Sequence, residues 1–90
     1  MIMMSDFNTI IAKARNLCYY YSIDTRPRAT YMHFIREFRN EMKEVLKTIP
    51  EYTEEFDYLR EMIRECPKSI KEEECHEYIT NKLRPRFYES

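Results

Sequence analysis

The sequence predicts an all-α protein, a small antiparallel bundle of about four helices that forms a single helical domain over residues 1–90. Three observations favour this fold class. The chain contains no glycine, the residue that tight β-turns use where the backbone needs a positive φ. Apolar residues recur every three or four positions in four segments, as they do along one face of a helix. Prolines stand near the ends of those segments, where helices start and stop.

Residues 5–21 and 27–49 are the first two predicted helices, and Ser5 is a suitable N-cap for the first. Pro27 fits the first turn of the second helix, because a missing N–H has no partner to lose there. The first helix has an apolar stripe of Phe7, Ile10, Ile11, Ala14, Leu17, Cys18 and Tyr21. The second has a seam in steps of four and three, widened by Phe34 and Leu46: Tyr31, Ile35, Phe38, Met42, Val45 and Ile49.

Residues 50–66 and 69–83 are the third and fourth predicted helices. Capping boxes of Thr48 with Glu51 and of Ser69 with Glu72 predict their starts, with Pro50 in the first turn of the third. Their apolar stripes are Tyr52, Phe56, Leu59, Ile63 and Cys66, then Cys75, Tyr78, Ile79 and Leu83. Pro85 is expected to end the fourth helix and leave residues 84–90 as a short C-terminal tail. The alternative arrangement has three long helices, with residues 69–83 as a bent C-terminal end.

Charge is distributed unevenly along a chain whose net charge is −1. Residues 11–50 contain eight Lys and Arg against four Asp and Glu, whereas residues 51–76 contain nine acids against four bases. Attraction between packed helices explains this pattern. The alternative explanation is a bipolar surface for a partner or for head-to-tail self-association.

Composition excludes several classes of function. Without glycine the chain has no P-loop, no dinucleotide-binding turn and no G-x-S-x-G nucleophile elbow. An odd number of cysteines and no secretory signal predict reduced thiols in an intracellular compartment, the cytoplasm. No apolar run reaches membrane length, so a soluble protein is expected.

Residues 18–31, "CYYYSIDTRPRATY", are the most unusual stretch. Tyr21 continues the apolar stripe and should pack inward, which leaves Tyr19 and Tyr20 partly exposed on either side. The stretch reads as a corner between helices, as a Tyr and Arg surface for another protein, or as a platform for nucleic-acid bases with Arg26 and Arg28 on phosphates. The predicted partner-binding residues are Tyr19, Tyr20, Arg26, Arg28, Arg84, Arg86, Phe87 and Tyr88.

No catalytic residue, metal site or cofactor is predicted. Cys66, Cys75 and His76 lack the close ligand pairs of zinc sites, so the two cysteines are expected to be buried and His76 solvated. A Cys–His nucleophile would need an oxyanion hole that nothing in the sequence builds. Acid pairs such as Glu54 and Glu55 stand at predicted helix starts, where they favour the helix dipole.

Residues 30–42, "TYMHFIREFRNEM", resemble the second helix of the LYR-motif mitochondrial accessory proteins. Ile35, Arg36, Phe38 and Arg39 match part of that family's pattern, with one residue missing between its two halves. The Leu-Tyr-Arg tripeptide itself is absent from the first helix, which reads "AKARNLCYY". The resemblance implies a small helical adaptor that acts with an acyl-carrier protein.

These observations predict a non-enzymatic protein–protein interaction module: an adaptor, an inhibitor or a small subunit of a larger assembly. Apolar surface beyond what four short helices can cover would form a subunit or homodimer interface. The alternatives are a nucleic-acid-binding regulator that uses the basic N-terminal half, and a divergent LYR-like mitochondrial adaptor.

Overall fold

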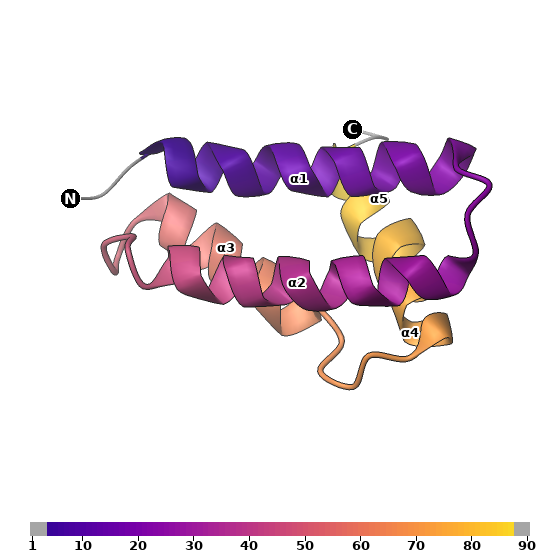
Figure 1. Ribbon diagram of the computed structural model, residues 1–90. Helices are drawn as coiled ribbons and strands as arrows, with labels where there is room; N and C mark the ends of the chain where they lie inside the picture. The colour runs from indigo at the N-terminus through magenta and orange to yellow at the C-terminus, as the bar shows by residue number, and fades with distance from the viewer. Residues whose placement is uncertain (1–3, 88–90) are drawn as a thin grey trace.

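Four helical segments make up the fold in the computed structural model, which describes residues 4–87 (Figure 1). They are α1 (Met4–Ile23), α2 (Arg28–Leu46), α3 (Glu54–Glu65) and a C-terminal run of α4 (Glu72–Glu77), the π-helix η1 (Tyr78–Leu83) and α5 (Arg84–Phe87). No strand occurs within this range. The prediction of an all-α bundle of about four helices is therefore confirmed.

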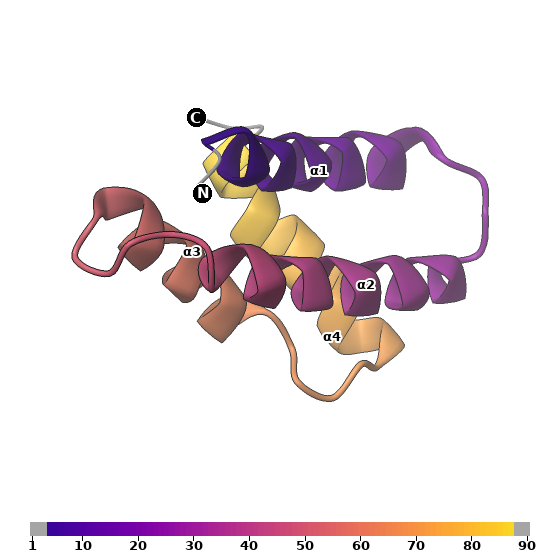
Figure 2. The same cartoon turned by 60° about the vertical axis from the view of Figure 1, so that its left-hand side comes forward.

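α1 and α2 lie side by side and antiparallel, and the rest of the chain packs on one side of this pair (Figures 1 and 2). α3 packs against α2, and α4 also contacts α2. The C-terminal run then crosses behind the pair, so that η1 and α5 reach α1 (Figure 2). As a result, no other helix among residues 4–87 lies over one face of the α1–α2 pair (Figures 1 and 2).

The core lies between the α1–α2 pair and the elements behind it, and it follows the predicted stripes closely. Ile10, Ala14 and Cys18 of α1 are buried. The seam of α2 is buried at Tyr31, Ile35, Phe38 and Met42, and the C-terminal run is buried at Cys75, Tyr78, Ile79 and Leu83. Helical periodicity alone therefore identified most of the core in three of the four segments.

The connection between α2 and α3 differs from the prediction. α2 ends at Leu46 and α3 begins only at Glu54, so neither the helix to residue 49 nor the Thr48–Glu51 capping box is present. Thr53 is the N-cap instead, and its Oγ1 accepts the backbone N–H of Phe56 at 3.2 Å. Three acids then fill the first turn, where the helix dipole favours them: Glu54, Glu55 and Asp57.

Tyr52 was expected in the apolar stripe of the third helix, and this prediction was wrong. Its side chain is 96% exposed, and its φ of 69° lies in the left-handed region. Met62, which was not in the predicted stripe, is fully buried and belongs to the apolar face of α3. Because the chain has no glycine, a tyrosine has to adopt the backbone conformation that this turn requires.

Replacing this tyrosine by glycine should stabilise the protein. Positive φ costs a residue with a Cβ about 1 kcal/mol, part of which glycine loses again through its larger entropy in the unfolded chain. We expect Tyr52→Gly to raise the free energy of unfolding by roughly 0.5 kcal/mol, measured by urea denaturation. Tyr52→Ala is the matched control, because it removes the same side chain and keeps the Cβ. Equal stability of the two variants would contradict the argument.

The C-terminal run also differs from the prediction at both ends. α4 begins at Glu72 after Lys71, without a side-chain cap, so the Ser69–Glu72 capping box is absent. The helix does not stop before Pro85. In η1 the turn widens, and the N–H of Arg84 donates to the carbonyl of Ile79, five residues back. Pro85 follows directly after this widened turn, as the second residue of α5, and the chain stays helical to Phe87.

Candidate functional site

Two half-exposed tyrosines mark the C-terminal end of α1. The side chains of Tyr19 and Tyr20 are 46% and 48% exposed, as the sequence predicted. Their rings pack edge to face, with centroids 5.3 Å apart. Tyr21 turns inward, also as predicted, and packs edge to face on Tyr31 at 4.9 Å. The corner therefore presents a pair of mutually supported aromatic rings to the solvent.

The turn after α1 holds Arg26 in place. Asp24 accepts the backbone N–H of Arg26 at 2.9 Å, forms an ion pair with its guanidinium group, and accepts the hydroxyl of Tyr31 at 2.9 Å. These bonds stabilise the carboxylate and hold the pKa of Asp24 below its usual value, with the backbone bond as the largest cause. The guanidinium carbon of Arg26 lies 5.2 Å from the ring centroid of Phe34. Arg26 is thus exposed yet fixed in position.

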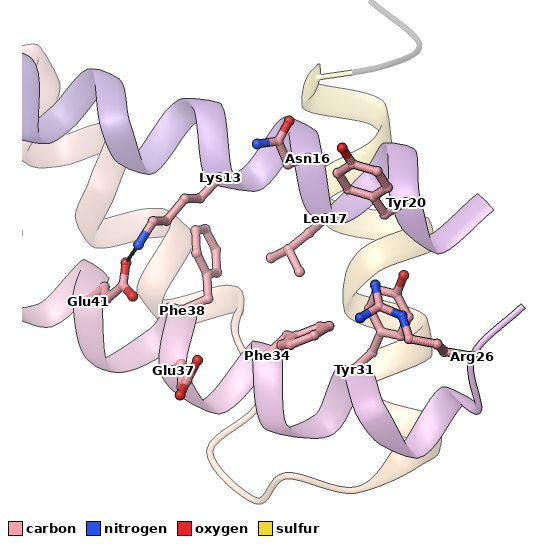
Figure 3. Close-up of a pocket in the computed structure, with 10 residues that line it drawn as sticks. All are labelled: Lys13, Asn16, Leu17, Tyr20, Arg26, Tyr31, Phe34, Glu37, Phe38 and Glu41. Carbon is pink, nitrogen blue, oxygen red and sulfur yellow. Dashed lines mark hydrogen bonds and ion pairs between the residues drawn. The ribbon is translucent and has the colours of Figure 1, made fainter. Parts of the chain in front are cut away.

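A groove of about 300 Å³ lies between α1 and α2 beside this corner (Figure 3). Leu17 from α1 and Phe34 and Phe38 from α2 point toward one another across it and form its apolar floor (Figure 3). Its remaining lining residues are Lys13, Asn16, Tyr20, Arg26, Tyr31, Glu37 and Glu41. In Figure 3 the C-terminal run lies behind the side chains that line the groove, and Figure 1 shows no other helix of residues 4–87 on the near side of the α1–α2 pair.

The groove continues along the pair beyond an ion pair between Lys13 and Glu41, which crosses it (Figure 3). A second hollow of about 270 Å³ lies on the far side and shares Glu41 with the first. Its other lining residues are Asp6, Thr9, Ile10, Asn40, Glu44 and Val45. We refer to the two hollows together as the α1–α2 groove.

The other predicted partner-binding residues lie elsewhere. Arg28 lines a separate hollow of about 400 Å³ with acids and a histidine of α4: Glu72, Glu73, His76 and Glu77. Arg86 is paired with Glu65 at 2.9 Å and lies 5.1 Å from the ring centroid of Tyr58, and Phe87 packs against the core. Arg84 is partly buried. Tyr88 lies outside the described residues, so the structure gathers only Tyr19, Tyr20 and Arg26 at one corner.

His76 was expected to be solvated, and this prediction was wrong. It is partly buried, and its Nδ1 forms a hydrogen bond with the hydroxyl of Tyr21. The two rings also pack against each other, with centroids 5.6 Å apart. His76 therefore joins the C-terminal run to the end of α1 and has a structural partner.

All three cysteines are buried and free, as expected for Cys66 and Cys75. Burial raises the pKa of Cys18 to about 11 and that of Cys66 to about 12, and it also raises the pKa of Cys75. A nucleophilic cysteine needs solvent access and a lowered pKa, so these thiols have the opposite properties. Within residues 4–87, no group of three or more His, Cys, Asp or Glu side chains is placed to hold a metal ion.

The basic and acidic halves of the sequence are not joined by direct ion pairs in the described part of the chain. Lys13, Arg26 and Lys47 pair with acids of their own half: Glu41, Asp24 and Glu44. Arg28 lines the same hollow as the acids of α4, without an ion pair to them. Of the helices described, none has the length and apolar character needed to cross a membrane.

Sequence reasoning missed most of the groove, including Leu17 and Phe34 as partly exposed lining residues with the buried Phe38 beneath them. One signal pointed to it. The apolar seam of α2 is wider than one neighbouring helix needs, because Phe34 lies beside the main row. A wide seam indicates a second contact face in addition to the core.

Comparison of the chain with protein-family models, with curated proteins and with solved structures gave no match. The resemblance of residues 30–42 to the LYR-motif proteins thus gains no support from these comparisons. Ile35 and Phe38, two of its matching residues, are core residues of α2.

Proposed function

We propose that this chain is a non-enzymatic protein–protein interaction module, an adaptor, inhibitor or small subunit, that binds its partner at the α1–α2 groove. The observation that carries the proposal is the open apolar floor of the groove beside Tyr20 and Arg26. Aromatic and arginine side chains around an apolar pocket are the residue types that dominate binding energy at protein interfaces. Asp24 holds Arg26 in place before binding, which reduces the entropy lost on binding.

Of the predicted contact residues, we retain Tyr19, Tyr20 and Arg26 in the proposed binding surface. The floor of the groove is added to them. Arg86 is less suited to a partner, because it is already paired with Glu65 and only 24% of its side chain is exposed. Arg28 faces acids of its own chain. Three of the eight Lys and Arg residues in residues 11–50, Arg26 among them, are paired with acids, which leaves fewer cations for the phosphate contacts that the nucleic-acid alternative needs.

The test uses a double variant, Tyr20→Ala with Arg26→Ala, on the immobilised chain. We expect this variant to capture much less partner protein than the wild type does from an extract of the native cell. Its circular dichroism spectrum should remain that of a folded helical protein. The matched control is Tyr52→Ala with Arg60→Ala, which removes one exposed tyrosine and one exposed arginine at α3 and the turn before it. Equal capture by both double variants would show that this surface is not the binding site.

A further inference from the structure

The edges of the α1–α2 groove are acidic. Its charged lining residues are four acids, Asp6, Glu37, Glu41 and Glu44, against two bases, Lys13 and Arg26. Arg26 is further neutralised by Asp24, which lies outside the lining. Three of the four acids come from α2 and follow one edge of the groove. The groove therefore combines an apolar floor with a negative edge.

The acids of this edge are free to exchange partners. Glu37 pairs with His33 at 3.0 Å and Glu44 with Lys47 at 3.3 Å, but the side chains in both pairs are 58–73% exposed. Exposed pairs of this kind contribute little stability, typically below about 1 kcal/mol. A cation from a partner can replace His33 or Lys47 at little cost.

The dimensions of the groove fit a helix. It extends along α1 from Asp6 to Tyr20, which corresponds to about 21 Å at 1.5 Å per residue. An amphipathic helix of about four turns has this length and presents an apolar stripe of the right kind to the floor. Such a helix would cover the face of the α1–α2 pair over which the described part of the chain places no other helix (Figure 1).

We infer that the α1–α2 groove binds a basic amphipathic helix of another protein, with apolar side chains on Leu17, Phe34 and Phe38 and lysines or arginines along the acidic edge of α2. The inference rests on the proposed function and names the kind of partner. A second copy of this chain fits less well, because it would bring the same acidic edge against itself, and like charges across an interface are costly.

The Lys13–Glu41 ion pair crosses the groove and has to open or be passed over when the helix docks (Figure 3). Its side chains are 45% and 41% exposed, so opening it costs little. Once released, Glu41 joins the acidic edge and can take a cation of the partner. Lys13 therefore competes with the partner's cations for Glu41. Removing the Lys13 side chain should free Glu41 and so strengthen the binding of a basic helix.

The test uses three synthetic 18-residue peptides and the full chain, with binding measured by fluorescence anisotropy. The first peptide has leucines along one helical face and lysines elsewhere, the second has glutamates in place of the lysines, and the third is a scramble of the first. We expect the first to bind at least tenfold more tightly than the other two. If the scrambled peptide bound as tightly as the first, charge attraction alone would explain the binding. If the glutamate peptide bound as tightly as the first, the acidic edge would have no part in recognition. Either result overturns the inference.

Variants of the chain locate the binding. Glu37→Lys with Glu44→Lys should weaken the leucine–lysine peptide about tenfold, whereas Glu73→Lys with Glu74→Lys, an equal charge change on exposed residues of α4, should change it less than twofold. Lys13→Ala should tighten binding several-fold, and Lys43→Ala, an exposed lysine outside the groove lining, should leave it nearly unchanged. Weaker binding by Lys13→Ala would contradict the competition for Glu41.

Two further measurements separate this inference from the proposed function. Suppose that capture of a partner depends on Tyr20 and Arg26 while the leucine–lysine peptide does not compete with that partner. In that case the inference of a basic helix fails, and the proposed protein–protein interaction module is retained. If capture does not depend on those residues, the proposed function fails. Sedimentation of the chain alone addresses self-association, since a stable dimer that Glu37→Lys with Glu44→Lys dissociates or strengthens would assign the groove to a second copy and overturn the inference.

Discussion

Raising the pH from 9 to 11 should remove about 4 kcal/mol from the free energy of unfolding, a large part of the total stability of many domains of this size. The cause is the buried thiols. Burial raises the pKa of Cys18 from 9.0 to about 11 and that of Cys66 from 9.0 to about 12. Between these limits each thiol loses its proton in the unfolded chain but keeps it in the native one. The unfolded state then binds fewer protons, so stability falls as pH rises, by about 1.4 kcal/mol per pH unit for each group.

Below about pH 8 these thiols are protonated in both states, so they should have no effect on the pH dependence of stability there. The raised pKa values of the buried tyrosines act in the same direction at higher pH, because burial also disfavours their charged forms. The measurement is urea denaturation under reducing conditions at steps from pH 8 to 11. Cys18→Ala with Cys66→Ala is the control, and its stability should decline less steeply with pH. Parallel slopes for the two proteins would show that the thiols are not responsible.

The sequence was sufficient to predict the helices, because the information needed is local and periodic. A residue such as Ile35 or Leu83 recurs at helical spacing, and every such stripe has to be buried somewhere. The ends of helices were harder. Capping motifs are short and common, and Thr48, Thr53 and Ser69 are all suitable N-caps by residue type. Thr53 is the N-cap of α3 because the turn before it buries Ile49 and exposes Tyr52. This choice depends on tertiary packing and not on the local sequence.

The π-helix and the groove depend on contacts that no local pattern describes. Pro85 normally predicts the end of a helix, but the wider turns of η1 let the chain continue as α5, where Arg86 reaches Glu65 of α3. The groove depends on which face of the α1–α2 pair the C-terminal run covers. The sequence predicted that Tyr19, Tyr20 and Arg26 lie at an exposed corner, but it could not show that Leu17 and Phe34 extend this corner into an apolar floor.

Ile35→Ala should lower the free energy of unfolding by about 3 kcal/mol, a large part of the total for a domain of this size. Ile35 is fully buried near the middle of α2, the element that packs against α1, α3 and α4. Truncating it removes apolar contacts and leaves a cavity that three surrounding elements cannot easily fill. Phe38, one turn further along the same face of α2, and the adjacent Phe34 both line the groove. A local loosening at Ile35 would therefore also reach the binding surface.

The matched control is Ile23→Ala, which makes the same chemical change at a residue that is 56% exposed. We expect it to alter stability by less than about 0.5 kcal/mol. Urea denaturation followed by circular dichroism measures both variants, and an unchanged m-value would show that the same amount of surface is exposed on unfolding. Similar losses for the two variants would mean that the face of α2 that carries Ile35 is not packed as the structure has it. Because Phe38 lies on this same face and lines the groove, the floor of the groove would then lack a packed support.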